Sequence, residues 1–318
     1  MRVLIINNLH SGLRDGRIFE FIRKLSQDGD ELIIRNTDVS TPIETLLLDA
    51  DSCDFVVAAG GDGTIASVCY ALRSTGIPIL VFPAGTGNLL ATNLNQPDES
   101  YALVDMVRSG YTLDFDLGEF IFRGTEKTVT KGFVVIAGAG YDATIMEDSE
   151  RLKDSLGPGA YIIAALANPS PELAHFTIDL DDQRIEIDGI AVLVLNFAKI
   201  YPDISITHSN DARDGLLEVA IIKPHTAVEL IPAFLSAFLD RTGRFPHRAD
   251  AIDTFRSKNI RVEADPPLHL QYDGEAQGFI TPFEARVLPG ATRLFVTRQE
   301  YEHLTSSEKE TSGIADSN

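Results

Sequence analysis

FVVAAGGDGT (residues 55–64) and ILVFPAGTGN (residues 79–88) decide the fold, because each is an apolar run that ends in a glycine-rich turn. A continuous apolar run is typical of a strand buried on both faces of a parallel sheet. Glycine at the strand end adopts positive φ at low cost and lets a ligand approach the main chain. A helical pattern, 65–74, follows the first turn, and the first N–H groups of a helix attract anions. The stretch therefore predicts a phosphate-binding site.

The polar residues of the two turns suit the same chemistry. Gly61, Gly63, Thr64 and Thr86 can hold phosphate through main-chain N–H and hydroxyl groups. Asp62 would repel a bare phosphate, so it makes sense beside a divalent cation or as a proton acceptor in phosphoryl transfer. The alternative is that both turns are ordinary strand-to-helix connections. Two such turns in tandem, filled with polar side chains, favour the ligand-binding interpretation.

The rhythm of the sequence changes near Leu113. Before it, strands alternate with helices, which predicts right-handed βαβ units, a parallel sheet covered on both faces, and ligands at the carboxyl ends of the strands. After it, β-rich runs follow one another, which predicts a mainly antiparallel domain of two packed sheets. The predicted strands are 3–6, 32–35, 55–59, 79–82, 176–180, 184–187, 191–197, 217–222, 259–263 and 293–296, and the predicted helices are 17–27, 42–51, 65–74, 143–154 and 226–239.

Composition limits the function. The 318 residues are 44% hydrophobic, enough for two domains with a core each. The longest apolar runs fall far short of the roughly twenty residues that span a bilayer, and no signal peptide is recognisable. Cys53 and Cys69 form no metal or redox pair, so we expect a cytoplasmic protein.

Charge bears on the partners. With 27 basic and 47 acidic residues the net charge is −20, which argues against nucleic acid as a partner. The same charge opposes contact with an anionic membrane. The basic stretch Arg241–Arg248 is either a local membrane contact or a solvated connection.

The ordered set of motifs resembles the diacylglycerol kinase catalytic-domain family of bacterial lipid kinases and sphingosine kinases. The two turns, Gly132–Tyr161, DGLLEV (214–219) and DGE (273–275) carry the resemblance, which extends from about Met1 to Arg298. It implies a three-layer, parallel-sheet nucleotide-binding α/β domain (1–122 with about 291–305), a mainly antiparallel β-sandwich acceptor domain (123–290), and an active cleft between them. We expect the polar tail, 306–318, to be disordered.

The resemblance also implies an ATP site. Asn8-Leu9-His10-Ser11-Gly12 occupies the place of a family nucleotide turn, although Leu9 stands where proline is usual, and Thr92 replaces a frequent arginine after the second glycine turn. Taken singly, Asn8, Ser11 and Thr37 are equally compatible with plain turn chemistry. The implied nucleotide-binding residues are Asn8, Ser11, Gly12, Thr37, Gly60, Gly61, Asp62, Gly63, Thr64, Gly85, Thr86, Gly87 and Asn88.

A carboxylate should accept the proton of the attacking hydroxyl. The resemblance gives this role to Glu275, close to Asp273, with Asp62 as the rival base. The segment 272–275 also matches a plain Asp-Gly hairpin turn. For Mg²⁺, the resemblance implies a structural site at Asp211, Asp214 and the carbonyl of Leu216, whereas spacing alone favours a solvated turn.

Three functions remain open. The leading one is a Mg-ATP-dependent lipid kinase that visits the inner face of the membrane and phosphorylates a lipid hydroxyl, diacylglycerol by default. The second is an NAD-kinase-like enzyme with a soluble acceptor, since NAD kinases share GGDGT. The third is a non-catalytic nucleotide- or lipid-binding protein, against which the presence of Asp62, Thr86 and Glu275 argues. A homodimer is a further partner hypothesis.

Overall fold

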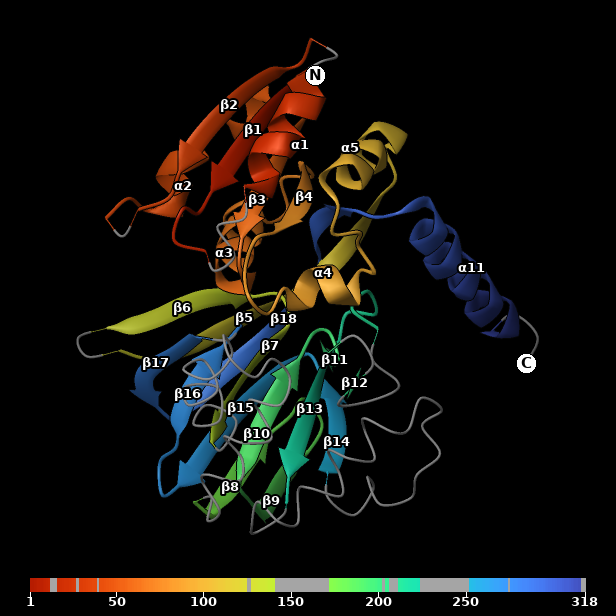
Figure 1. Cartoon of the computed structure of the whole chain (residues 1–318). Coiled ribbons are helices and arrows are strands. Elements are labelled where there is room, and N and C mark those ends of the chain that lie inside the picture. Colours follow the sequence, from red (N-terminus) through yellow and green to blue (C-terminus); the bar gives the residue numbers. More distant parts are fainter. Residues whose placement is uncertain are drawn as a thin grey trace. The chain divides into compact units, whose positions relative to one another are not determined.

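The computed structural model describes residues 1–11, 16–26, 29–38, 40–124, 127–140, 172–201, 204–205, 211–223, 252–273 and 275–315. The chain forms two compact units, Met1–Phe115 with Gly290–Asn318, and Asp116–Pro289. It passes from the first unit to the second in β5 (Thr112–Arg123) and returns in β18 (Phe283–Phe295) (Figure 1). The strands of the first unit pair mainly in parallel and those of the second mainly antiparallel, and β18 contributes to both units.

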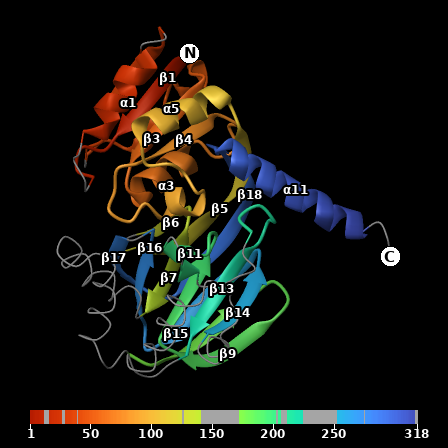
Figure 2. The ribbon, with the colours of Figure 1, turned by 45° about the vertical axis from the view of Figure 1, so that its right-hand side comes forward.

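The first unit is built on a parallel sheet of order β2-β1-β3-β4-β18, in which only the end of β18 takes part. Helices α1 and α5 lie side by side (Figure 2). The strands are β1 (Arg2–Asn7), β2 (Glu31–Asn36), β3 (Phe55–Gly60) and β4 (Pro78–Pro83). The helices are α1 (Arg17–Ser26), α2 (Ile43–Leu46), η1 (Ala50–Ser52), α3 (Asp62–Ala71), α4 (Leu89–Asn93), α5 (Ser100–Ser109) and α11 (Arg298–Ala315).

Strand alternation explains how the helices cover this sheet. Val3, Ile5 and Val57 point to one face, where they pack with Phe21 of α1 and Leu103 of α5. The residues between them point to the other face and are also buried, as a parallel sheet inside a doubly wound domain requires. Helix α3 contacts β3 and α2. The glycine turns are thus held at the edge of a rigid core.

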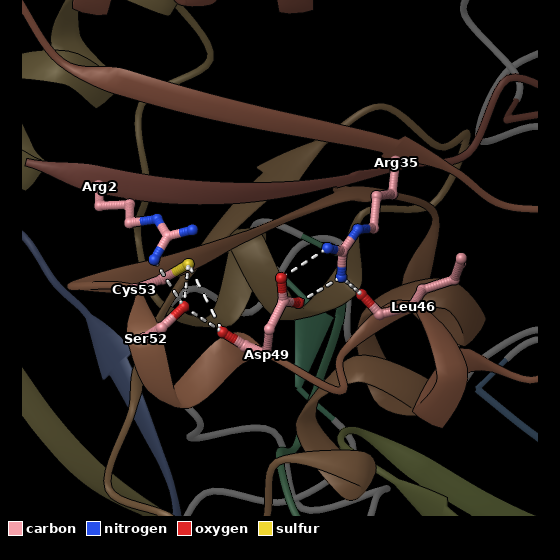
Figure 3. Close-up of polar contacts among 6 residues, drawn as sticks. All are labelled: Arg2, Arg35, Leu46, Asp49, Ser52 and Cys53. Carbon is pink, nitrogen blue, oxygen red and sulfur yellow. Dashed lines mark hydrogen bonds and ion pairs between the residues drawn. The ribbon is translucent and has the colours of Figure 1, made fainter.

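The segment predicted as one helix, 42–51, forms two short pieces, α2 and η1. Arg35 of β2 donates to the carbonyl oxygen of Leu46 (2.6 Å) and to both carboxylate oxygens of Asp49 (2.5 and 2.7 Å). Figure 3 shows these bonds beside those that link Arg2, Ser52 and Cys53. The carbonyl of Leu46 accepts from the Arg35 side chain, and the N–H of Ala50 donates to the carbonyl of Leu47 instead, so the α-helix ends at Leu46. The prediction of one continuous helix is wrong there.

The second unit consists of two mainly antiparallel sheets. One contains β5, β6, β9, β8, β15 and the start of β18, and the other has the order β14-β13-β10-β7-β16-β17. A separate hairpin pairs β11 (Lys199–Tyr201) with β12 (Ile204–Ser205). The remaining strands are β6 (Thr128–Phe133), β7 (Ile136–Gly140), β8 (Ala174–Asp179), β9 (Arg184–Gly189), β10 (Ala191–Leu195), β13 (Leu217–Ile222), β14 (Ile252–Ser257), β15 (Asn259–Asp265), β16 (His269–Tyr272) and β17 (Glu275–Ile280).

One hydrophobic core joins the two sheets of this unit. It packs Phe120, Phe176 and Phe283 of the first sheet with Val192 and Val219 of the second. The aromatic ring centroids of Phe120 and Phe283 lie 4.7 Å apart. Side chains from two facing sheets that share one core define a β-sandwich. The predicted fold class, a parallel-sheet α/β domain followed by a β-sandwich, is therefore confirmed.

Several expectations from the sequence are not settled by these elements. The helices predicted at 143–154 and 226–239 and the basic stretch Arg241–Arg248 lie outside the described residues. Helix α11 continues past Ser306, where the sequence predicts a disordered tail. The exact domain limits and the tail stay predictions. None of the helices in the described ranges is long and apolar enough to cross a membrane.

Candidate functional site

Four predicted nucleotide-binding segments follow the carboxyl ends of neighbouring strands in the first unit. Asn8 follows β1, Thr37 follows β2, and Gly60 and Pro83 end β3 and β4. Backbone bonds join the strand ends, from Asn8 N–H to the Ala59 carbonyl (2.9 Å) and from Thr37 N–H to the Asn7 carbonyl (2.9 Å). In an open α/β sheet this edge is where ligands bind.

The two glycine turns touch one another. A Cβ built on Gly85 would lie 2.5 Å from the Cα of Gly61, so the two main chains pass closer than any side chain permits. A Cβ on Gly60 would meet the side chain of Thr64 at 2.6 Å. Glycine is therefore required at Gly85 by the close approach of the two turns, and at Gly60 by packing within the first turn.

Asp62 connects the first turn to the second. Its carboxylate accepts the N–H groups of Leu89 and Leu90, each at 3.0 Å, and its residue is 8% exposed. The carboxylate thus caps the start of α4. Close by, a Cβ on Gly87 would lie 3.2 Å from its Oδ2. Asp62 shapes the site by holding the two turns together. This structural role differs from the role beside a metal ion that the sequence predicts.

Asn88 fixes the second turn internally. Its Oδ1 accepts the N–H of Gly85 (2.9 Å) and its Nδ2 donates to the carbonyl of the same residue (2.8 Å). Asn88 has the left-handed conformation with φ of 50°, which asparagine tolerates better than most residues. Thr86 and Gly87, between these anchors, are exposed to solvent. The turn thus presents its central residues outward.

The start of α3 completes the arrangement. Asn8 donates through Nδ2 to the hydroxyl oxygen of Thr64 (2.8 Å), and a Cβ on Gly61 would lie 3.8 Å from the Oγ of Ser11. The N-cap residue of α3 is Gly61, which has no side chain to cap the helix, and the N–H groups of the first helical turn, which includes Gly63, have no acceptor within the helix. Gly12 lies outside the described residues. The structure thus brings most predicted nucleotide-binding residues together, with Thr37 at the next strand end.

In the second unit, Asp273 and Glu275 flank a tight hairpin. Strands β16 and β17 pair Tyr272 with Glu275, so this segment is a hairpin turn as well as a candidate catalytic motif. Asp273 is 4% exposed and has a φ of 42°. Its carboxylate accepts the N–H groups of Val134 (2.8 Å), Val135 (2.9 Å) and Ile136 (3.2 Å). Asp273 therefore holds the hairpin against the start of β7. For Glu275, the structure describes the backbone alone.

The predicted metal-binding turn, 211–216, is tightly hydrogen-bonded. Asp211 accepts the N–H of Arg213 (3.1 Å), and Asp214 accepts that of Leu216 (2.9 Å). The second oxygen of Asp214 forms an ion pair with Arg256. No three His, Cys, Asp or Glu side chains within the described ranges gather into a metal cluster. The predicted ligands, two carboxylates and one carbonyl, remain compatible with a hard cation.

Two buried polar residues of this unit escaped the sequence analysis. Asp116 accepts the N–H of Gly215 (2.7 Å), and Asn196 donates to the carbonyls of Asp116 (2.8 Å) and Val134 (3.0 Å). For Asn196, the available signal was a polar residue at the end of a continuous apolar run, AVLVLN (191–196), the same pattern as VLIIN (3–7). Both residues organise the neighbourhood of the candidate catalytic and metal-binding residues.

Comparison with known proteins identifies the class. A family model described as "Diacylglycerol kinase catalytic domain" matches residues 2–120, and one described as "YegS C-terminal NAD kinase beta sandwich-like domain" matches residues 135–296. The two matches follow the order of the α/β unit and the β-sandwich unit. The chain therefore belongs to the diacylglycerol kinase catalytic-domain family, in the branch whose members carry a YegS-type C-terminal domain.

Individual proteins named as diacylglycerol or lipid kinases match most of this chain. A diacylglycerol kinase of Mycobacterium tuberculosis is 27% identical over 256 residues, 79% of each chain. A Klebsiella pneumoniae protein named "Probable lipid kinase YegS-like" is 27% identical over 308 residues, 92% of this chain and 94% of that one. The match to an uncharacterized Synechocystis protein, 28% identical over 256 residues, spans only 56% of that protein's length.

A solved structure shares the fold. The crystal structure of a diacylglycerol kinase from Bacillus anthracis superposes with a TM-score of 0.72 at 20% sequence identity, covering 94% of this chain and 98% of that chain. At this identity the likeness concerns the fold.

Proposed function

We propose that this protein is an ATP-dependent lipid kinase that transfers the γ-phosphate of ATP to a lipid hydroxyl, with diacylglycerol as the default acceptor. The observation that carries the proposal is the contact between the two glycine turns at the carboxyl ends of β3 and β4. At Gly85 only a residue without a side chain fits, and main-chain N–H groups at a helix start are suited to binding phosphate.

The reaction assigns a role to each unit. In the first, Gly61, Gly63 and Thr64 at the start of α3 and Thr86 in the second turn bind the phosphates of ATP. In the second, the carboxylate of Glu275 accepts the proton as the acceptor oxygen bonds to the γ-phosphorus and the bond to the β-γ bridging oxygen breaks. The products are ADP and the lipid phosphate. Asp62 and Asp273 position these elements, because backbone N–H groups already occupy their carboxylates.

Mg²⁺ would be held by Asp211, Asp214 and the carbonyl of Leu216. All three supply oxygen, the ligand that this cation prefers. Bound Mg²⁺ would stabilise the turn at 211–216 and reduce its negative charge. Arg256 competes for Asp214, so the free chain already balances part of the charge of this turn.

A lipid acceptor is favoured over a soluble one by two observations. The second glycine turn reads Pro83–Asn88, PAGTGN, rather than the Gly-x-Asn-x-Gly type that NAD kinases usually have. In addition, relatives that match most of the chain are named lipid or diacylglycerol kinases. The NAD-kinase-like alternative is supported by the description of the second family model. A non-catalytic binder remains the third alternative.

The deciding experiment is a transfer assay with labelled ATP and Mg²⁺. Separate panels contain diacylglycerol in mixed micelles, sphingoid bases, and NAD, and Glu275→Gln serves as the low-activity control. We expect label in diacylglycerol, and about a hundredfold less or lower still with Glu275→Gln. Label in NAD alone would establish the second function, and binding of ATP without any transfer would support the third. Sedimentation with vesicles of anionic and neutral lipids tests whether the protein visits a membrane despite its net charge of −20.

A further inference from the structure

Asn196 is a fully buried residue at the end of β10 whose bonds converge on one short segment. Its Nδ2 donates to the carbonyl of Val134 (3.0 Å) and to that of Asp116 (2.8 Å). Its backbone N–H donates to the carbonyl of Val135 (2.9 Å). One residue thus holds two successive carbonyl groups just before β7.

Asp273 holds the same segment through its N–H groups. The carboxylate accepts from Val134, Val135 and Ile136, and the N–H of Asp273 donates to the carbonyl of Ile136 (2.8 Å). The peptide groups of Val134 and Val135 are therefore fixed on both sides, by an amide that donates and by a carboxylate that accepts. Buried bonds of this kind act together as a network.

The network ends two residues before Glu275. Asp273 has a φ of 42°, which a two-residue Asp-Gly hairpin turn favours. Its carboxylate ties this turn to the N–H groups of residues 134–136, and Asn196 holds carbonyls of the same segment. A shift of Val134 or Val135 would therefore move Asp273, and with it the start of β17.

We infer that Asn196 is a positioning residue for phosphoryl transfer, which acts through Val134, Val135 and Asp273 on the placement of Glu275. The inference rests on the proposed function. Among the described residues, Oδ1 of Asn196 has no hydrogen-bond partner, so the donating side of the amide is the part that the structure uses. An aspartate of equal size at this position would face two carbonyl oxygens with nothing to donate.

The test compares Asn196→Asp and Asn196→Ser with Ser257→Ala. Ser257 is buried in the same unit and its hydroxyl donates to Asp181 (2.8 Å), but no described bond joins it to residues 134–136. For the Asn196 variants we expect kcat to fall by about ten- to a hundredfold, since misplacing a catalytic group by about 1 Å costs on that order. The KM for ATP should stay within about twofold, because the proposed ATP contacts lie in the first unit. Ser257→Ala should lower stability without lowering the kcat of the folded fraction.

Two further measurements separate positioning from plain stability. Asn196→Asp combined with Asp273→Asn should be far less than additive in kcat, because both act on the same peptide groups. Additive losses, or a loss in kcat that merely follows the folded fraction in all variants, would overturn the inference.

Hydrogen exchange provides a readout that does not depend on activity. In either Asn196 variant we expect faster exchange in peptides covering residues 134–136 and 272–276, and in Ser257→Ala no change there. Unchanged exchange in the Asn196 variants would refute the inference even if the wild-type protein phosphorylates lipid. If exchange is faster in the Asn196 variants but the wild-type protein transfers no phosphate, the proposed function is refuted and the network stands.

Discussion

Gly85 and Gly61 approach so closely that a Cβ on Gly85 would lie 2.5 Å from the Cα of Gly61, whereas a Cβ on Gly61 would lie 3.6 Å from the Cα of Gly85. The same contact is thus impossible for alanine at one position and ordinary at the other. Alanine variants of the two glycines can therefore distinguish the packing of the turns from their proposed binding of phosphate.

We expect Gly85→Ala to destabilise the first unit by about 1–3 kcal/mol, as overpacking in a tight site typically does. Gly61→Ala should keep the stability of the wild type but weaken ATP binding, because the added methyl group points toward Ser11 in the proposed phosphate site. Thermal unfolding and calorimetric titration with ATP measure the two effects. Equal loss of stability in both variants would contradict this assignment of the two glycines.

Asp62→Asn tests the bridge between the turns. An amide can accept only one of the two N–H groups of Leu89 and Leu90, and its own NH₂ group would face the other. Leaving one buried donor unsatisfied costs about 1–3 kcal/mol. We therefore expect a lower Tm together with the loss of transfer. If Asp62→Asn keeps full stability but loses all activity, Asp62 acts in the chemistry itself, as the sequence analysis allowed.

Glu275 and Asp273 should respond differently to neutralisation. Glu275→Gln removes the proposed proton acceptor, so kcat should fall by about 10²- to 10⁴-fold while Tm stays unchanged. Asp273→Asn should lower both, since its carboxylate serves three buried N–H groups. Transfer assays and thermal unfolding of both variants provide the comparison. Full activity of Glu275→Gln would move the role of base to another carboxylate.

Much of the fold was visible in the sequence. The apolar runs before Asn8, Gly60 and Pro83 predicted buried parallel strands, and the structure confirms them as β1, β3 and β4. The motif order also pointed to the correct family. Such strands are predictable because burial on both faces demands an unbroken apolar run.

Other features depend on partners far apart in the chain. Helix α5 and strand β5 were missed, and nothing local in Asn196 shows that it meets Asp116 and Val134. Likewise, GGDGT marks Asp62 as polar in a turn, but its bonds to Leu89 and Leu90 arise only when two βα units lie side by side. Such contacts follow from tertiary structure, which overrides local pattern.

Asp38 offers a pH-dependent probe near Thr37. Hydrogen bonds from the side chains of Ser40 (2.6 Å) and Thr41 (2.8 Å), followed by those from their backbone N–H groups, lower the pKa of the Asp38 carboxyl to about 2. A depressed pKa in the folded state means that this turn adds stability above the unfolded value of 3.8, and that the contribution is lost as the pH falls toward 2. NMR titration should find the midpoint near 2 and a higher one in Ser40→Ala. Thr41→Ser, which keeps the hydroxyl, should change little; an unshifted Ser40→Ala would contradict the cause.

The magnesium proposal makes a prediction about Arg256, because its ion pair competes with a cation for Asp214. Arg256→Ala should increase the rise in Tm that Mg²⁺ produces, since Asp214 then interacts with the metal alone. At a hundredfold excess over Kd, bound Mg²⁺ stabilises the folded state by about 2.7 kcal/mol. Asp214→Asn should abolish the Mg²⁺-dependent rise, and Ca²⁺ and Na⁺ at matched ionic strength control for selectivity and screening. If Mg²⁺ raises Tm equally in the wild type, Arg256→Ala and Asp214→Asn, the cation binds elsewhere and the turn at 211–216 is purely structural.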